Sequence, residues 1–379
     1  MTETTHRSES TAPVAIYVAC ELGNTTWKLA ATTSRGDRLR RYTIEAGDVV
    51  ALFEKLERAR EQWGVAAGTP VVSCYEAGRD GFWLHRCLTA HGVRNVVVDA
   101  SSIERDRRAK HVKTDRVDAE RLLALLRDWA EGRKRLRTVR VPSEAEEDAR
   151  QAARELGTVK GVRTAVRNRI TSLLVAQGVR VRVTATPPLD PTTLRTWEGA
   201  PLPAGLCGRL TREIAELAAL TRRIAALQGA RRQAIAARTT RATQQMAQLM
   251  TLAGIGANGS ERLVVEFFAW RAFRNGREVG ALAGLTPTPY QSGDLRRDQG
   301  ISKAGNWRVR TMAIELAWCW LRFQPTSGLA RWYQVRFGHG SGRLRRIGIV
   351  ALARKLLIAL WRYLETGELP EGSLVRAVA

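Results

Sequence analysis

Hydrophobic residues in the first third of the chain fall into short runs separated by turn-like segments and amphipathic stretches. Five runs have the length of strands and alternate with turn signals: 14–20, 27–33, 38–44, 70–75 and 95–99. Three stretches show helical spacing instead: 49–63, 82–91 and about 114–131. Three strands followed by alternating helices and strands predict an α/β domain in which helices pack on a mixed sheet.

The middle of the chain has helical periodicity interrupted by prolines. Ser143 and Glu146 form a capping-box pattern ahead of a helix that we expect to run to about Gln177. Five prolines mark 184–205 as a linker or loop, and a long helix is predicted from Cys207 to about Leu249. Its apolar seam repeats every four and three residues, at Leu210, Ile214, Leu217, Thr221 and Ile224. Such a seam packs either within its own chain or between two chains, and the pattern leaves both open.

From about Thr251 onward the pattern is mainly helical with basic loops, ending in an amphipathic helix at Ala351–Leu364. The segment Leu249–Phe267 predicts a helix-hairpin-helix, with Gly254 and Gly256 in its turn. Backbone N–H groups in such a turn can contact a phosphate, although a plain turn between core helices fits the same residues. The expected division is a disordered leader at 1–13, an α/β domain at 14–141, a helical coiled-coil region at 142–248 and a C-terminal domain at 249–379.

Charge narrows the possible partners. The 61 Lys and Arg exceed the 37 Asp and Glu by 24, and the sequence pI is about 11.0. A polyanion would neutralise this excess; nucleic acid is the usual one and an anionic membrane is the rival.

No apolar run reaches the ~18 residues of a membrane span, and the leader lacks an apolar signal core, so we expect a cytoplasmic protein. The five cysteines are scattered, without a CxxC pair, which argues against disulfides and structural zinc.

Acidic residues at strand ends suggest a metal site. Glu21 follows the first predicted strand and Glu76 the fourth, while Asp115 and Asp118 share one face of a predicted helix start. Cleavage of a phosphodiester by two metals needs about four such carboxylates, with Mg²⁺ favoured and Mn²⁺ possible. Each acid also has a structural reading, as a helix cap or a solvated turn residue.

The turn ELGNTTWKL also resembles the first phosphate-binding hairpin of sugar-kinase and actin-like ATPases. That class needs later glycine-rich adenosine and phosphate loops, and no convincing pair is present in the sequence. A net charge of +24 is also unusual for a small-molecule kinase.

The segment QSGDLRRDQGISKAG combines hydroxyls and cations: Ser292, Arg296, Arg297, Ser302 and Lys303. Arginines beside a serine can bind a phosphate and prepare the hydroxyl for attack, although a basic hairpin that only binds phosphates fits equally. No histidine lies nearby to act as a base. A second basic run is expected to track phosphates through Arg107, Arg108, Lys110 and Lys113.

These motifs together resemble the insertion-sequence 110 family of transposases. The resemblance spans nearly all of residues 14–365 and rests on CELGNTTWKLA, CYEAGRDGFWL, KTDRVDAERLL, LAGIG, GLTPTPYQSGDLRRDQGISKAGNWRVR and ARKLLIALW. It implies a ribonuclease-H-like (RuvC-like) N-terminal domain, a coiled-coil middle and a C-terminal transposase domain.

The resemblance also implies roles for residues. It makes Glu21, Glu76, Asp115 and Asp118 the metal-binding tetrad and Ser292 the nucleophile, although the family usually has aspartate where this chain has Glu21. It further implies a structured noncoding (bridge) RNA that pairs with donor and target DNA, and assembly as dimers to tetramers near the bacterial nucleoid. The alternatives are a RuvC-like junction-resolving nuclease that activates water and a non-catalytic RNA- or DNA-binding scaffold.

Overall fold

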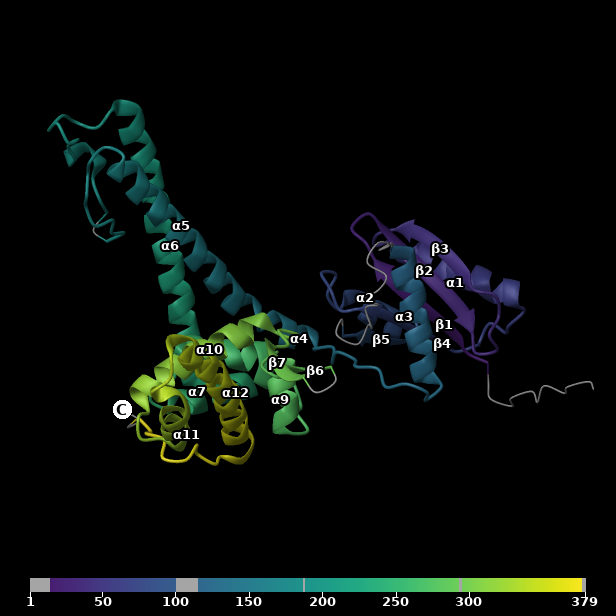
Figure 1. Ribbon diagram of the computed structural model, residues 1–379. Coiled ribbons are helices and arrows are strands. Elements are labelled where there is room, and N and C mark those ends of the chain that lie inside the picture. The colour runs from purple at the N-terminus through teal and green to yellow at the C-terminus, as the bar shows by residue number, and fades with distance from the viewer. Residues whose placement is uncertain (1–13, 100–114, 187, 293–294, 377–379) are drawn as a thin grey trace, which may run out of the picture. The chain divides into compact units, whose positions relative to one another are not determined.

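The computed structural model describes residues 14–99, 115–186, 188–292 and 295–376 (Figure 1). The chain divides into two compact units, Met1–Pro142 and Ser143–Ala379. Each unit has its own buried core, and each is described by itself below.

The first unit is built on a five-stranded sheet, which confirms the mixed sheet predicted from the hydrophobic runs. Its strands are β1 (Ile16–Leu22), β2 (Thr26–Thr33), β3 (Arg40–Glu45), β4 (Val71–Glu76) and β5 (Arg94–Val98). They lie in the order β3-β2-β1-β4-β5. The first three strands form an antiparallel meander, and β4 and β5 continue the sheet parallel to β1.

Helices cover both faces of this sheet. Alternate β1 side chains enter two separate cores: Ile16, Val18 and Cys20 join one, Tyr17 and Ala19 the other. The first core is closed by α1 (Val49–Trp63) and α2 (Trp83–Ala90), and the second by α3 (Asp115–Ala130). Because side chains alternate between the two faces of the sheet, an odd or even position along a strand determines which helices a residue contacts.

Two contacts fix the direction in which α3 crosses the sheet. The guanidinium of Arg94, at the start of β5, lies 5.2 Å from the ring centroid of Trp129 near the end of α3. Farther along the strands, Cys74 Sγ lies 3.9 Å from the carbonyl oxygen of Leu122. The helix therefore runs antiparallel to β4, and its first turn lies toward the carboxyl ends of the parallel strands.

The second unit begins with a long helical hairpin, made of α5 (Gln151–Val175) and α6 (Ala204–Ala237), preceded by the short α4 (Glu144–Asp148). The seam predicted on α6 packs against α5 of the same chain, and its four apolar members Leu210, Ile214, Leu217 and Ile224 are buried there. The predicted helix boundaries were wrong in two places. Helix α4 ends before α5 begins, and α6 stops at Arg238, whose φ of 50° is incompatible with a continued helix.

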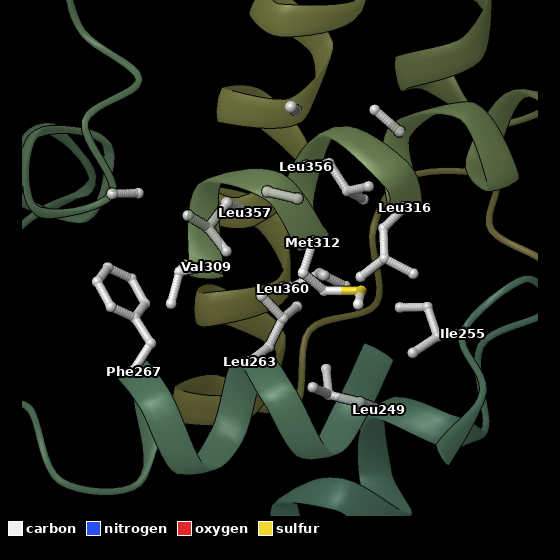
Figure 2. Close-up of a cluster of buried hydrophobic side chains, with 14 of the residues drawn as sticks. Leu249, Ile255, Leu263, Phe267, Val309, Met312, Leu316, Leu356, Leu357 and Leu360 are labelled. Atoms are coloured by element: carbon white, nitrogen blue, oxygen red, sulfur yellow. The ribbon is translucent and has the colours of Figure 1, made fainter. Parts of the chain in front are cut away.

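The remaining helices enclose the largest core of the chain. They are α7 (Arg241–Met250), α8 (Ala257–Leu263), α9 (Gly276–Leu282), α10 (Trp307–Phe323), α11 (Gly328–Tyr333) and α12 (Gly342–Thr366). Two π-helical turns, η3 (Val264–Phe268) and η4 (Gln334–Gly338), extend α8 and α11. Figure 2 shows Leu263, Met312 and Leu360 meeting at the centre of this core.

One two-stranded hairpin interrupts the helices. Strands β6 (Pro287–Ser292) and β7 (Leu295–Ile301) pair in the segment whose sequence predicts a basic hairpin. Across the described residues no helix is long and apolar enough to cross a membrane.

Candidate nuclease edge and serine hairpin

Glu21 and Glu76 lie at the carboxyl ends of neighbouring parallel strands. The β1–β4 register pairs Cys20 with Tyr75, so the next step along both strands sets Glu21 beside Glu76. Glu21 lies two residues after Ala19, and Glu76 two after Cys74, so each points to the same face as that residue. Ala19 and Cys74 belong to the core beneath α3. The sheet therefore points both toward the face that α3 covers.

The other two acids of the predicted tetrad arrive on α3. Asp115 and Asp118 occupy its first turn, which lies toward this same edge of the sheet. Asp118 is partly exposed and lies 3.9 Å from the guanidinium of Arg121. The side chain of Asp115 is outside the description. Among the side chains that are described, no three of His, Cys, Asp or Glu are close enough to hold a metal.

The donor chemistry at this edge suits a hard divalent cation, because all four predicted ligands are carboxylates. What the fold contributes is their common location: two strand ends and one helix start, from three separate parts of the sequence. That is the arrangement from which carboxylates converge on metal ions at a phosphodiester.

A cation that the sequence did not single out lies at the same edge. Arg79, just after β4, donates a hydrogen bond to Asn24 in the β1–β2 turn, and its guanidinium lies 3.8 Å from Asp80. The side chain of Arg79 remains 61% exposed, so it can also meet an anion. No motif pointed to it, because the pairing joins two loops 55 residues apart.

Asp99 also follows a strand and was not selected from the sequence. It comes directly after Val98, which the register pairs with Glu76. Val98 belongs to the core beneath α3, so alternation turns the next residue toward the opposite face. A position at a strand end is therefore not sufficient to place an acid at the predicted metal site. Glu21 and Glu76 point to the α3 face of the sheet, and Asp99 points to the opposite face.

The predicted nucleophile ends strand β6 in the second unit. The register pairs Ser292 with Leu295, Gln291 with Arg296 and Tyr290 with Arg297. Both predicted phosphate-binding arginines thus lie across the hairpin from the two residues that precede the serine. The side chains of 289–299 are outside the description, and only their backbone register is used here.

The loop after β7 is held firmly against the end of α9. The backbone N–H of Ser302 donates to Thr286, that of Lys303 to Gly284 and that of Asn306 to Leu282, at 2.8, 3.2 and 3.1 Å. Lys303 has a φ of 54°, an uncommon conformation for a residue with a side chain. Both Ser302 and Lys303 are exposed, so the loop presents a hydroxyl and a cation to solvent from a fixed backbone.

The predicted glycine turn joins α7 to α8. Gly254 has a φ of 91°, and a Cβ there would lie 3.1 Å from Cβ of Phe323 on α10. Gly254 thus permits close packing against α10, while Gly256 faces open space and precedes α8. The other predicted phosphate-tracking residues, Arg107, Arg108, Lys110 and Lys113, lie outside the described residues.

A buried carboxylate links the helical hairpin to the serine segment. Glu266, in η3, is 2% exposed and receives two hydrogen bonds from Arg154 of α5, at 2.8 and 3.0 Å. Its other partners are Asn306, the N-cap of α10, at 3.4 Å, and Arg308 at 3.9 Å. The sequence around Glu266 does not indicate its role, because its partners lie 112 and 40 residues away.

Comparison with known proteins gives matches in both units. Residues 21–177 match the family model DEDD_Tnp_IS110, described as a transposase, and residues 246–332 match the model of the Transposase IS116/IS110/IS902 family. The chain is 37% identical to "Putative transposase y4rJ" of Sinorhizobium fredii, across 96% of this chain and 95% of the relative. It is 33% identical to "Probable family 20 transposase" of Pseudomonas aeruginosa, across 67% of this chain and 73% of the relative. A transposase for insertion sequence element IS1328 of Yersinia enterocolitica is 30% identical over 120 residues, 30% of this chain and 34% of the relative.

Proposed function

Since this chain belongs to the IS116/IS110/IS902 family of insertion-sequence transposases, we propose that it cuts and rejoins DNA through a covalent bond to Ser292, with Glu21, Glu76, Asp115 and Asp118 as metal ligands. The family makes DNA the substrate and implies dependence on a divalent metal. The observation that supports the proposal is that Glu21 and Glu76 end neighbouring parallel strands at the edge of the sheet toward which the first turn of α3 lies.

The first unit supplies the acidic half of the proposed site. Its strand order, with an antiparallel meander followed by two parallel strands, supports a ribonuclease-H-like (RuvC-like) domain. A bound Mg²⁺ or Mn²⁺ would neutralise charge on the scissile phosphate and on the oxygens that enter and leave. The four carboxylates would bind the metal ion, and Arg79 would offer a further contact to a phosphate.

The second unit supplies the nucleophile. Ser292 Oγ attacks phosphorus and releases its proton to solvent, while the bond from phosphorus to the leaving sugar oxygen breaks and that oxygen takes up a proton. A sugar hydroxyl of the other DNA end then attacks the phosphoserine and regenerates the serine. Each phosphoester bond that breaks is replaced by another, so no high-energy cofactor is needed. Arg296, Arg297, Ser302 and Lys303 contact the phosphates flanking the attacked one.

We extend the proposal to nucleic-acid partners. The net charge of +24 supports simultaneous binding of donor DNA, target DNA and a structured bridge RNA whose base pairing selects the sequence. The α7–α8 turn at Gly254 and Gly256 would add a helix-hairpin-helix contact to a phosphate backbone. A dimer or tetramer would bring the carboxylate edge of one protomer to the serine hairpin of another.

The test is a labelled DNA substrate incubated with protein and Mg²⁺, then run on a denaturing gel. Wild-type protein and a Ser172→Ala control, on an exposed position of α5, should give a protein–DNA adduct, and Ser292→Ala should give none. Strand cleavage that persists in Ser292→Ala without any adduct in wild type would instead indicate a nuclease that activates water.

A further inference from the structure

The second unit carries a further group of exposed cations, outside both matched segments of the sequence. It lies on η4 and the first turn of α12, and we call it the η4–α12 surface. Between Glu315 and Glu365 the sequence holds nine Lys and Arg and no Asp or Glu. Four of these cations lie within eleven residues: Arg336, Arg343, Arg345 and Arg346.

All four arginines are exposed, and within the described residues none forms an ion pair. Two of them, Arg343 and Arg345, occupy the start of α12, whose first turn has no acidic residue. Cations there oppose the positive end of the helix dipole, so they lower the stability of the isolated protein. An unpaired, destabilising cluster of this kind is explained by binding to an anion.

The backbone that presents this cluster is fixed. Tyr333 donates a hydrogen bond to the carbonyl of Arg345 at 3.3 Å. A Cβ on Gly348 would lie 2.4 Å from the ring of Phe337, so only glycine lets η4 pack this closely on α12. The π-helical turn widens the backbone at Val335, whose side chain is 87% exposed. Leu344 and Ile347, on α12, are also exposed, at 40% and 52%.

The chemistry of the surface distinguishes between possible polyanions. Proteins that hold single strands stack bases on aromatic rings, but here Tyr333 is buried, and Trp332 packs against Phe337 and the ammonium of Lys355. What the surface exposes between its arginines is aliphatic. Aliphatic side chains flanked by cations suit the grooves of a duplex, where they contact sugars and base steps.

We propose that the η4–α12 surface binds duplex DNA, with the four arginines on backbone phosphates and Val335 in a groove. The proposal rests on the proposed function in that DNA is the polyanion on which the protein acts. It does not depend on the serine chemistry, because it concerns equilibrium binding alone.

The experiment measures binding of the full chain to a fluorescent DNA duplex by anisotropy, with a chelator present, over a range of salt concentrations. The triple variant Arg343→Gln, Arg345→Gln, Arg346→Gln should bind roughly tenfold or more weakly at 0.1 M salt. Its plot of log affinity against log salt should be shallower by about 2 to 3, because each lost phosphate contact contributes about 0.9. Val335→Thr, of the same shape, should weaken binding with an unchanged slope.

The matched control removes three charges elsewhere: Arg212→Gln, Arg222→Gln, Arg232→Gln, all exposed on α6. An equal loss in this control would overturn the proposal, because net charge alone would then explain the effect. A larger loss of affinity for an RNA duplex than for DNA would overturn the choice of DNA. The thermal midpoint of the η4–α12 triple variant should equal or exceed that of wild type, which separates lost binding from lost folding.

The two proposals fail independently. If no adduct ever forms but the triple variant still loses DNA affinity, the serine mechanism fails and the surface stands. If the adduct forms normally and the triple variant binds DNA unchanged, the surface fails and the mechanism stands.

Discussion

Arg154 of α5 and Glu266 of η3 form a two-pronged ion pair, with hydrogen bonds of 2.8 and 3.0 Å across 112 residues of sequence. The carboxylate is almost fully buried, while the arginine side chain is 41% exposed. Because Glu266 also meets Asn306, which caps α10, this pair joins the base of the helical hairpin to the loop that follows β7.

Loss of the arginine should destabilise the second unit strongly. Arg154→Leu leaves a buried carboxylate with Asn306 and a more distant Arg308, and we expect a loss of about 2–3 kcal/mol in unfolding free energy. Arg169→Leu is the control, because its partner Glu213 is less deeply buried, 14% exposed against 3% for Glu266, and we expect a smaller loss. Denaturation in urea measures both. Equal losses would mean that burial of Glu266 is unimportant.

The same pair predicts a dependence on pH. Burial raises the pKa of Glu266, but the hydrogen bond and charge of Arg154, with Asn306 and Arg308, outweigh it and hold the pKa below its ordinary 4.5. The folded state therefore binds this proton less tightly than the unfolded state. The stabilisation is fully present above about pH 4.5 and is lost as pH falls through the folded pKa.

This pH dependence can be measured by comparing wild type with Glu266→Gln in denaturation series from pH 7 to pH 3. The stability deficit of the variant should shrink once the pH falls below about 4.5. Glu155→Gln, whose partner Arg223 is exposed, should show only a small deficit at pH 7. A deficit for Glu266→Gln that stays constant down to pH 3 would contradict the assigned cause.

Substitutions at the carboxylate edge should abolish chemistry and spare the fold. Asp118→Asn and Glu76→Gln each remove one charge from partly exposed positions, and we expect roughly 10³-fold slower strand transfer with an unchanged thermal midpoint. Asp99→Asn is the matched control, because Asp99 follows Val98 of the α3 core and therefore points toward the other face of the sheet. Removal of divalent metal should match the effect of the Asp118 substitution. Retained activity in either edge variant would remove that residue from the site.

Glu21 allows a test of ligand length. Glu21→Asp keeps the charge and shortens the side chain by one methylene, and it should retain strand transfer within about tenfold of wild type, whereas Glu21→Gln should lose it. The measurement is the rate of adduct formation at several Mg²⁺ concentrations. Similar rates for the two variants would mean that the Glu21 charge does not contribute.

The loop after β7 should tolerate no side chain at Gly305. Its φ is 100°, and a Cβ would lie 2.1 Å from the carbonyl oxygen of Leu282. Gly305→Ala should therefore cost at least about 2 kcal/mol and displace Ser302 and Lys303. Gly300→Ala has a similar φ of 92° but open space around it, so about 1–2 kcal/mol is expected. Calorimetry distinguishes the steric clash from the backbone cost.

The cysteines of the sheet should be chemically inert. Burial raises the pKa of Cys20 to about 12 and that of Cys74 well above its ordinary value, so almost no thiolate forms near pH 8. Alkylation of the folded protein, followed by mass spectrometry, should modify these two roughly 100-fold or more slowly than the partly exposed Cys87, Cys207 and Cys319. Urea should equalise the rates. Fast labelling of Cys20 without urea would show that β1 opens locally.

The sequence alone determined the strands and helices of the first unit and the apolar seam of α6, because periodicity follows from local geometry and each run was long enough to reveal it. It missed the break at Ala149, whose backbone angles remain helical, and the break at Arg238, where a left-handed backbone conformation ends α6. It also left open what the α6 seam packs against, because a heptad pattern is the same whether the partner helix belongs to the same chain or another.

Only the tertiary structure decided which acids share an edge. Glu21, Glu76 and Asp99 all lie at the ends of strands. Strand register and the alternation of side chains place Glu21 and Glu76 on the α3 face of the sheet and Asp99 on the opposite face. The direction of α3, set by contacts at Arg94 and Cys74, brings Asp118 to the same end. These relationships depend on pairings between residues far apart in the chain, and local sequence does not encode which distant partner a strand or helix will meet.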